Sequence, residues 1–164
     1  MIKSYCKINL FLKILKKNNT GLHNIQSTTM LLNFYDNIHV EITKKKIDEV
    51  KFTGPFKKNI NIKKNTVISA LSLLRSQNLI NPDIKYKIVI NKKIPVYAGL
   101  GGGTGNAVSI IKFFFKKKIS LKLLEIFENK IGSDLRLFFL NHSFQKNLKK
   151  IIPFKRKYKY YFLL

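Results

Sequence analysis

Five of the 8 glycines in this chain fall in one window, residues 95–107, which reads PVYAGLGGGTGNA. Because glycine lacks a Cβ atom, such a loop can adopt positive φ angles and bring successive backbone N–H groups close to an anion. The stretch before the window is typical of a strand. The stretch after it is typical of a helix, whose N-terminus, with Thr104 at its mouth, adds N–H groups and the positive end of a dipole. The window therefore predicts a phosphate-binding loop, and a tight structural turn is the alternative.

The two commonest phosphate-binding motifs do not match this window. A Walker loop requires Lys followed by Ser or Thr after its last glycine, whereas Gly105 is followed by Asn106 and Ala107. A dinucleotide-binding loop requires an acidic residue about twenty positions further on. Glu125 lies near that distance but falls inside a predicted helix.

Phosphoryl transfer to an alcohol needs a phosphate cradle, a cation near the transferred group, and a group that receives or steers the hydroxyl proton. Asp134 is one of only 8 acidic residues and directly follows Gly132 and Ser133, so it is a candidate for the last role. A turn-capping aspartate is the alternative. Lys7 is one of 32 basic residues, and its type alone indicates a solvated strand lysine. His23, one of 3 histidines, reads most simply as an incidental loop residue.

These candidates must be positioned by a mixture of strands and helices. Apolar patterning predicts strands over residues 7–15, 37–45, 48–54, 84–94, 135–140 and 158–164. In the first strand, one side is expected to carry Ile8, Leu10, Leu12 and Ile14. Helices are predicted over 66–78 with Asn65 as N-cap, over 106–117, and over 120–132 with Ser120 as N-cap and Gly132 at the end. This order is not a regular strand–helix alternation, so it predicts the α+β class.

The glycine window closely resembles the phosphate loop of the galactokinase–homoserine kinase–mevalonate kinase (GHMP) superfamily. Three further segments resemble that family in the same order: KINLFLKI (7–14), GLHNIQSTTMLLNFYDNIHVEI (21–42) and IGSDLRLFF (131–139). Within the superfamily, the chain is most similar to the members that phosphorylate a hydroxyl group of 4-diphosphocytidyl-2-C-methylerythritol in non-mevalonate isoprenoid synthesis. The resemblance implies the superfamily's N-terminal domain, of the ribosomal protein S5 domain 2 type, with a mixed or antiparallel sheet and helices on one face.

The resemblance also implies roles for individual residues. Lys7 and Asp134 match the catalytic lysine and aspartate, while Asn9 and His23 match residues on the substrate side. ATP is expected as the phosphoryl donor, with Mg²⁺, and no residue is assigned as a metal ligand. The residues expected to bind the nucleotide are Pro95, Ala98, Gly99, Leu100, Gly101, Gly102, Gly103, Thr104 and Gly105 of the loop, together with Asn65 and Lys92.

The sequence departs from the family pattern at several places. Leu22 replaces a tyrosine expected to stack on the cytosine ring, Arg136 replaces a proline, and Cys6 replaces an alanine. The family's second domain is expected to be absent, so residues 1–164 are interpreted as the N-terminal, ATP-binding domain alone. Apolar surface is then expected to be uncovered near the C-terminus, at YKYYFLL (158–164), which favours self-association or a separate chain that completes the cleft.

The formal net charge of +24 suggests a polyanionic partner, but the composition supports a weaker reading. The lysines are spread through every segment, and only Arg75, Arg136 and Arg156 are arginines, the residue type that reads base edges most often. The chain is also rich in residues with AT-rich codons, and this bias is an alternative source of the charge, so specific nucleic-acid binding is not expected. A lone cysteine and no uninterrupted membrane-length apolar run favour a cytoplasmic protein that does not act at a membrane. Three hypotheses remain open: a shortened working kinase, a decayed ATP-binding relic, and a basic binding module on a kinase scaffold.

Overall fold

A six-stranded mixed sheet forms the base of the computed structural model, which describes residues 1–17, 23–58, 60–62, 64–147, 150–154 and 160–162. Its strands are β1 (Ile2–Lys17), β2 (His23–Thr43), β3 (Glu49–Thr53), β4 (Lys85–Asn91), β5 (His142–Gln145) and β6 (Ile151–Pro153). The long strand β2 pairs with β1 along one edge, and its other edge pairs with β4 near its end and with β5 near its start. Only β3 and β4 run parallel among these strands.

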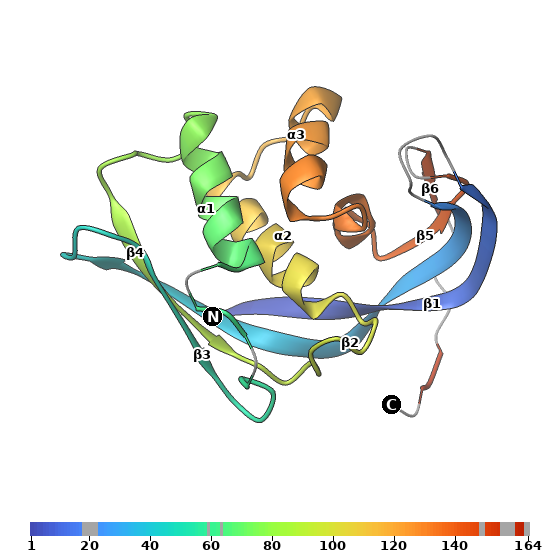
Figure 1. Ribbon diagram of the computed structural model, residues 1–164, viewed down its shortest axis with the longest axis horizontal. Coiled ribbons are helices and arrows are strands. Elements are labelled where there is room, and N and C mark those ends of the chain that lie inside the picture. The colour runs from blue at the N-terminus through green and yellow to red at the C-terminus, as the bar shows by residue number, and fades with distance from the viewer. Residues whose placement is uncertain (18–22, 59, 63, 148–149, 155–159, 163–164) are drawn as a thin grey trace.

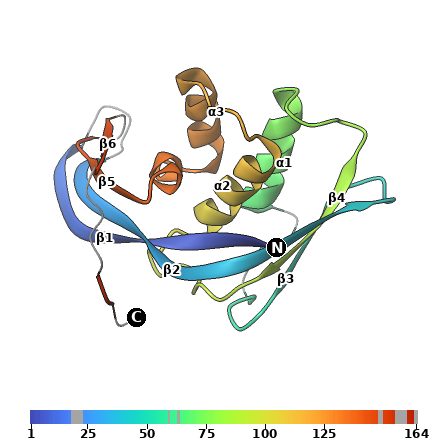
Figure 2. The same cartoon turned by 180° about the vertical axis from the view of Figure 1, so that it is seen from behind.

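Three α-helices cover one face of this sheet, as Figure 1 and the reverse view in Figure 2 show. They are α1 (Thr66–Ser76), α2 (Gly102–Phe114) and α3 (Leu121–Ile131), and the 3₁₀ helix η1 (Leu135–Phe139) follows α3. The core lies between the two layers and includes Ile38, Ile88, Ile90, Leu71, Leu74, Ile111 and Phe127. The predicted α+β class, with a mixed sheet and helices on one face, is confirmed.

The helices begin where the sequence places their caps. The Asn65 side chain accepts hydrogen bonds from the backbone N–H groups of Val67 and Ile68, and the Ser120 hydroxyl accepts one from Leu123. Both caps satisfy donors that a helix N-terminus leaves free. Gly132 ends α3 with a φ of 149°, a conformation that favours glycine. Helix α2 starts earlier than the predicted 106–117, because the last glycines of the loop form its first turn.

The strand predicted over 135–140 is wrong. The backbone N–H groups of Leu135 and Leu137 bond to the carbonyls of Gly132 and Asp134, which winds the segment into η1. Leu135, Leu137 and Phe138 are all buried in this conformation. A short apolar run buries equally well as a strand or as a helical turn, so its pattern did not separate the two.

The predicted apolar side of the first strand is also wrong in part. Leu10, Leu12 and Ile14 are 37%, 54% and 62% exposed. The register of β1 against β2 shifts between Asn9 and Phe11. The far part of the two strands extends beyond the helices and bends up beside β5 and β6 (Figure 1). A register shift moves side chains to the other face of a sheet, so simple alternation stops predicting burial there.

The C-terminal part of the chain was predicted least well. Strands β5 and β6 were not predicted, although Ser143 and Gln145 of β5 are buried beside β2. Most of the strand predicted over 158–164 lies outside the described residues, and residues 160–162 do not form a strand. Within the part of the chain that the structure describes, no helix is long and apolar enough to cross a membrane.

Candidate active site

The glycine loop joins β4 to α2 and is held at its start by a buried carboxylate. Asp36, on β2, pairs with the Lys92 ammonium, and its other oxygen accepts hydrogen bonds from the backbone N–H groups of Lys93 and Ile94, at 2.7 and 2.9 Å. The Asp36 and Lys92 side chains are 0% and 2% exposed. The loop ends at Gly101, which precedes α2 in the left-handed conformation with a φ of 66°. The chain therefore leaves the sheet from a fixed point and enters the helix through a turn that glycine makes without strain.

A cavity of about 390 Å³ opens beside the first turn of α2. Of the predicted nucleotide-binding residues, its wall includes Gly101, Gly102, Gly103, Thr104, Asn65 and Lys92. It does not include Pro95, Ala98, Gly99, Leu100 or Gly105. Asn61, Lys64 and Thr66, from the segment that leads into α1, lie on the same cavity. The structure thus gathers a helix N-terminus and several polar side chains around one hollow, which is a favourable setting for an anion.

Packing within the chain does not explain two features of this wall, the unpaired Asn106 side-chain oxygen and the glycine at position 103. Both are compatible with a bound nucleotide. Asn106 is 2% exposed and lines the cavity, and among the described residues its Oδ1 has no hydrogen-bond partner. Buried polar atoms are usually paired, so this oxygen is available to a ligand donor. A Cβ atom at Gly103 would come no closer than 3.6 Å to any neighbour, which is Thr66. The fold leaves room for a side chain there, and the glycine keeps the cavity open.

Asn65 and Lys92 lie in the cavity wall with their polar groups already engaged. The Asn65 amide caps α1 and donates to the carbonyls of Asn61 and Ile62. Lys92 is neutralised by Asp36. Their hydrogen bonds therefore serve to shape the wall, and direct recognition of the base by these two side chains stays a prediction.

Lys7 and Asp134 meet beside the glycine loop, although they come from opposite ends of the chain. The Lys7 ammonium lies 3.2 Å from a carboxylate oxygen of Asp134, and the two side chains are 8% and 34% exposed. The backbone N–H of Lys7 donates to the carbonyl of Leu100 at 2.9 Å. A Cβ atom at Gly101 would stand 3.2 Å from the Lys7 stem. The loop is thus packed directly against this lysine, and the predicted proximity of the pair to the loop is confirmed.

The two predicted substrate residues have different surroundings. The Asn9 amide oxygen accepts a hydrogen bond from the Lys7 ammonium at 2.6 Å, so Asn9 belongs to the same cluster. His23 is the first residue of β2 and pairs with Lys17, at the far end of the ribbon from Lys7, which pairs with Leu31. The His23 side chain and Leu22 lie outside the described part of the chain.

Several residues at the site were not singled out from the sequence. Asp36 and Asn106 gave no signal beyond their residue types, because their importance depends on burial and on partners distant in the sequence. Tyr97 gave a weak sequence signal, because it lies in the same window as the loop glycines. It lines the cavity, is 91% exposed and has a φ of 61°, which is unusual for a residue with a side chain.

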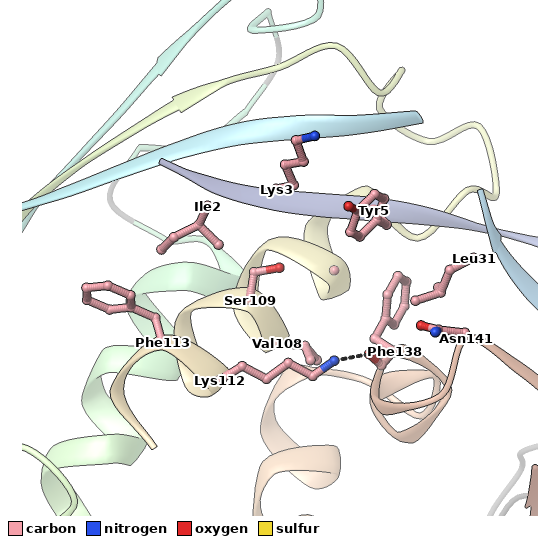
Figure 3. Close-up of a pocket in the computed structure, with 11 residues that line it drawn as sticks. Ile2, Lys3, Tyr5, Leu31, Val108, Ser109, Lys112, Phe113, Phe138 and Asn141 are labelled. Atoms are coloured by element: carbon pink, nitrogen blue, oxygen red, sulfur yellow. Dashed lines mark hydrogen bonds between the residues drawn. The ribbon is translucent and has the colours of Figure 1, made fainter. Parts of the chain in front are cut away.

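A second cavity, of about 340 Å³, lies on another side of α2, between Tyr5 and Leu31 of the sheet and Val108 of the helix (Figure 3). Lys112 reaches across it and donates to the carbonyl of Phe138 at 2.7 Å. Desolvation by the surrounding chain lowers the pKa of this lysine. Gly105 belongs to this cavity and not to the first, because α2 turns it toward the sheet.

The fold places a glycine loop at a helix N-terminus and a lysine–aspartate pair beside it, an arrangement suited to phosphoryl transfer. The family model for the GHMP kinases N terminal domain matches residues 65–148. The chain belongs to the GHMP kinase family.

Curated relatives and solved structures carry more particular names. A 4-diphosphocytidyl-2-C-methyl-D-erythritol kinase of Pelagibacter ubique is 40% identical over 139 residues, which cover 83% of this chain and 48% of the relative. The enzyme of that name from Buchnera aphidicola subsp. Schizaphis graminum is 34% identical, covering 98% of this chain and 58% of its own length. The chain thus spans about half the length of the curated relatives it matches.

The solved structures show the same fold. A crystal structure of 4-(cytidine 5'-diphospho)-2C-methyl-D-erythritol kinase gives a TM-score of 0.65 at 22% identity, covering 93% of this chain and 54% of that one. The mevalonate kinase of Methanococcus jannaschii gives 0.66 at 18% identity, covering 94% and 55%.

Proposed function

We propose that this chain binds ATP at the glycine loop and transfers the γ-phosphoryl group to a hydroxyl of 4-diphosphocytidyl-2-C-methyl-D-erythritol, a step of non-mevalonate isoprenoid synthesis. The observation that carries the proposal is the Lys7–Asp134 pair, whose charged groups lie 3.2 Å apart, with the Lys7 backbone hydrogen-bonded to the loop. The names of the curated relatives support the choice of substrate.

The proposed chemistry uses few groups. The substrate hydroxyl oxygen attacks the γ-phosphorus of ATP, the bond between that phosphorus and the bridging oxygen of ADP breaks, and the hydroxyl proton passes to the Asp134 carboxylate. The Lys7 ammonium stabilises the negative charge on the transferred group. The loop N–H groups and the N-terminus of α2 hold the remaining phosphates.

A Mg²⁺ ion would help by neutralising phosphate charge. No cluster of three or more His, Cys, Asp or Glu occurs in the part of the chain that the structure describes. Mg²⁺ typically keeps several waters and binds through substrate phosphates with one or two protein oxygens, so a sparse donor set fits it. Thr104 is the candidate donor, because it lies in the first turn of α2 and in the wall of the cavity.

The test is a phosphoryl-transfer assay with purified protein, Mg²⁺, ATP and the diphosphocytidyl substrate, run beside an ATP-binding titration. Asp134→Asn is expected to lower turnover by about 10²–10⁴-fold, because it removes the proton acceptor while keeping the shape of the side chain. The dissociation constant for ATP should remain close to that of the unmodified chain. Asp83→Asn is the matched control, since Asp83 is an exposed carboxylate that lines neither cavity.

The outcomes separate the remaining hypotheses. Turnover that depends on Asp134 and not on Asp83 supports the kinase. Saturable ATP binding without any transfer to the substrate identifies a nucleotide-binding relic. Failure to bind ATP contradicts the proposal at its first step.

A further inference from the structure

Behind the lysine–aspartate pair, a line of hydrogen bonds runs into the sheet through a buried serine, Ser27, and ends at a backbone carbonyl. Lys7 donates to Asn9 Oδ1, Asn9 Nδ2 donates to the Ser27 hydroxyl at 2.6 Å, and Ser27 donates to the carbonyl of Phe11 at 2.8 Å. We propose that Ser27 is a positioning residue, which fixes the direction of the Lys7 ammonium by fixing the orientation of the Asn9 amide. As a statement about catalysis, this rests on the proposed kinase function.

The direction of these hydrogen bonds, from donor to acceptor, is set by the last acceptor, the Phe11 carbonyl. A backbone carbonyl oxygen can only accept, so the single hydroxyl proton of Ser27 is committed to it. The Ser27 oxygen is then an acceptor toward Asn9, and only the amide nitrogen of Asn9 can donate to it. Ser27 is 0% exposed, so water does not replace either partner.

The consequence reaches Lys7. With its nitrogen toward Ser27, the Asn9 amide turns its oxygen toward the Lys7 ammonium, at 2.6 Å. The reversed amide would place its N–H₂ group against the N–H₃⁺ group, which is repulsive. Asn9 therefore takes up one of the three ammonium protons, and Asp134 lies at ion-pair distance from the same ammonium, which retains donor capacity for a ligand oxygen.

The strand geometry that permits this arrangement is the register shift in β1. Asn9 pairs with Thr29, but Phe11 pairs with Thr28 and Leu12 with Ser27. The shift brings the Phe11 carbonyl and the Asn9 side chain to the same hydroxyl. Bulges of this kind often re-aim side chains next to functional sites.

The activity test compares Ser27→Ala with Ser4→Ala in the full chain. Ser4 is also on the β1–β2 ribbon and 0% exposed, but its hydroxyl has no hydrogen-bond partner among the described residues. Ser27→Ala is expected to lower kcat about tenfold with little change in the KM for ATP, because a hydrogen bond that orders a charged group is lost. Ser4→Ala should leave both constants unchanged, and Ser27→Thr, which keeps the hydroxyl, should restore kcat.

A second measurement does not need turnover. In chain labelled with ¹⁵N-lysine, the Lys7 ammonium signal, assigned by its loss in Lys7→Arg, is expected to exchange slowly with water. Ser27→Ala should accelerate that exchange or shift the signal, and Ser4→Ala should not. An unmodified chain without kinase activity would contradict the proposed function while this experiment still tests the positioning role. An unchanged Lys7 signal in folded Ser27→Ala overturns the inference, whatever happens to kcat.

Discussion

The glycines between residues 99 and 105 meet different surroundings, and this separates packing from ligand binding. A Cβ atom at Gly101 would stand 2.6 Å from the ring of Phe138, and one at Gly105 would stand 2.9 Å from the carbonyl of Tyr5. These positions need glycine for the fold itself. Gly103 differs, because it has ordinary helical geometry and open space around its missing side chain. Packing within the fold therefore does not explain the glycine at this position.

Gly103→Ala is therefore expected to weaken ATP binding without harming the fold. Alanine favours helices over glycine by up to about 1 kcal/mol, so the melting temperature should stay the same or rise. The added methyl group should hold the phosphates away from the loop and lose at least one charge-assisted hydrogen bond, a loss of about tenfold or more in affinity. Calorimetric titration with ATP and a thermal melt measure the two effects. Unchanged ATP affinity in the folded variant would mean that the phosphates do not bind at this position.

The sequence predicted the proximity of the lysine–aspartate pair better than the groups that support it. Lys7 and Asp134 were assigned because their segments resemble a family, and the structure places them together. Ser27 and Asp36 were not assigned, because their roles depend on which strand lies beside them and on complete burial. Residue type and local spacing carry no record of either property, so a buried hydroxyl or carboxylate looks like any other polar residue.

At the scale of elements, the site depends on how the chain is held at the junction between β4 and the glycine loop. There, the Asp36 carboxylate of β2 pairs with the Lys92 ammonium and accepts hydrogen bonds from the backbone N–H groups of Lys93 and Ile94. A Cβ atom at Gly102 would lie 3.2 Å from the same ammonium, so the first turn of α2 is packed against the ion pair. The pair thereby links the sheet, the loop and the helix.

Asp36→Asn is expected to lower the free energy of unfolding by about 3–5 kcal/mol, because it leaves the buried Lys92 charge without its counter-charge. Glu41→Gln is the matched control, since Glu41 is also on β2 and pairs with a lysine of β4, Lys87, but both side chains are substantially exposed. No measurable change is expected from the control. Urea denaturation at neutral pH measures both. Equal stability of the two variants would refute the anchoring role of Asp36.

The helices whose ends are marked by capping residues were predicted correctly. The segments whose structure depends on packing against other elements were not. Asn65 and Ser120 mark the starts of α1 and α3, and the structure confirms both caps. The run after Asp134 has no such signal, and it forms a 3₁₀ helix because α2 and α3 bury it. The far half of β1 alternates as a strand should, but a register shift and the lack of a covering helix leave Leu12 and Ile14 exposed.

For the whole molecule, charge and exposed apolar side chains act together. Most acidic residues are engaged in ion pairs, such as Asp48 with Arg75 and Glu128 with Arg136, so the excess of +24 is carried by the remaining basic side chains. Apolar side chains are exposed within the expected segment 158–164, at Tyr160, Tyr161 and Phe162. The self-association expected from such a surface stays a prediction.

The net charge and the cavity predict two kinds of anion binding that respond differently to salt and to mutation. Binding to a single-stranded RNA oligonucleotide should arise from dispersed lysines, so it should fall steeply as salt rises. A protein that contacts about 6–10 phosphates of a duplex loses about 10³–10⁵-fold in affinity between about 50 and 200 mM salt. Gly103→Ala should not change RNA binding, because the variant keeps every charge, whereas it should weaken ATP binding.

Fluorescence anisotropy with the oligonucleotide and titration with ATP, each at several salt concentrations, measure the contrast. RNA binding that stays tight near physiological salt would instead favour the basic binding module, because charge attraction alone is largely screened there.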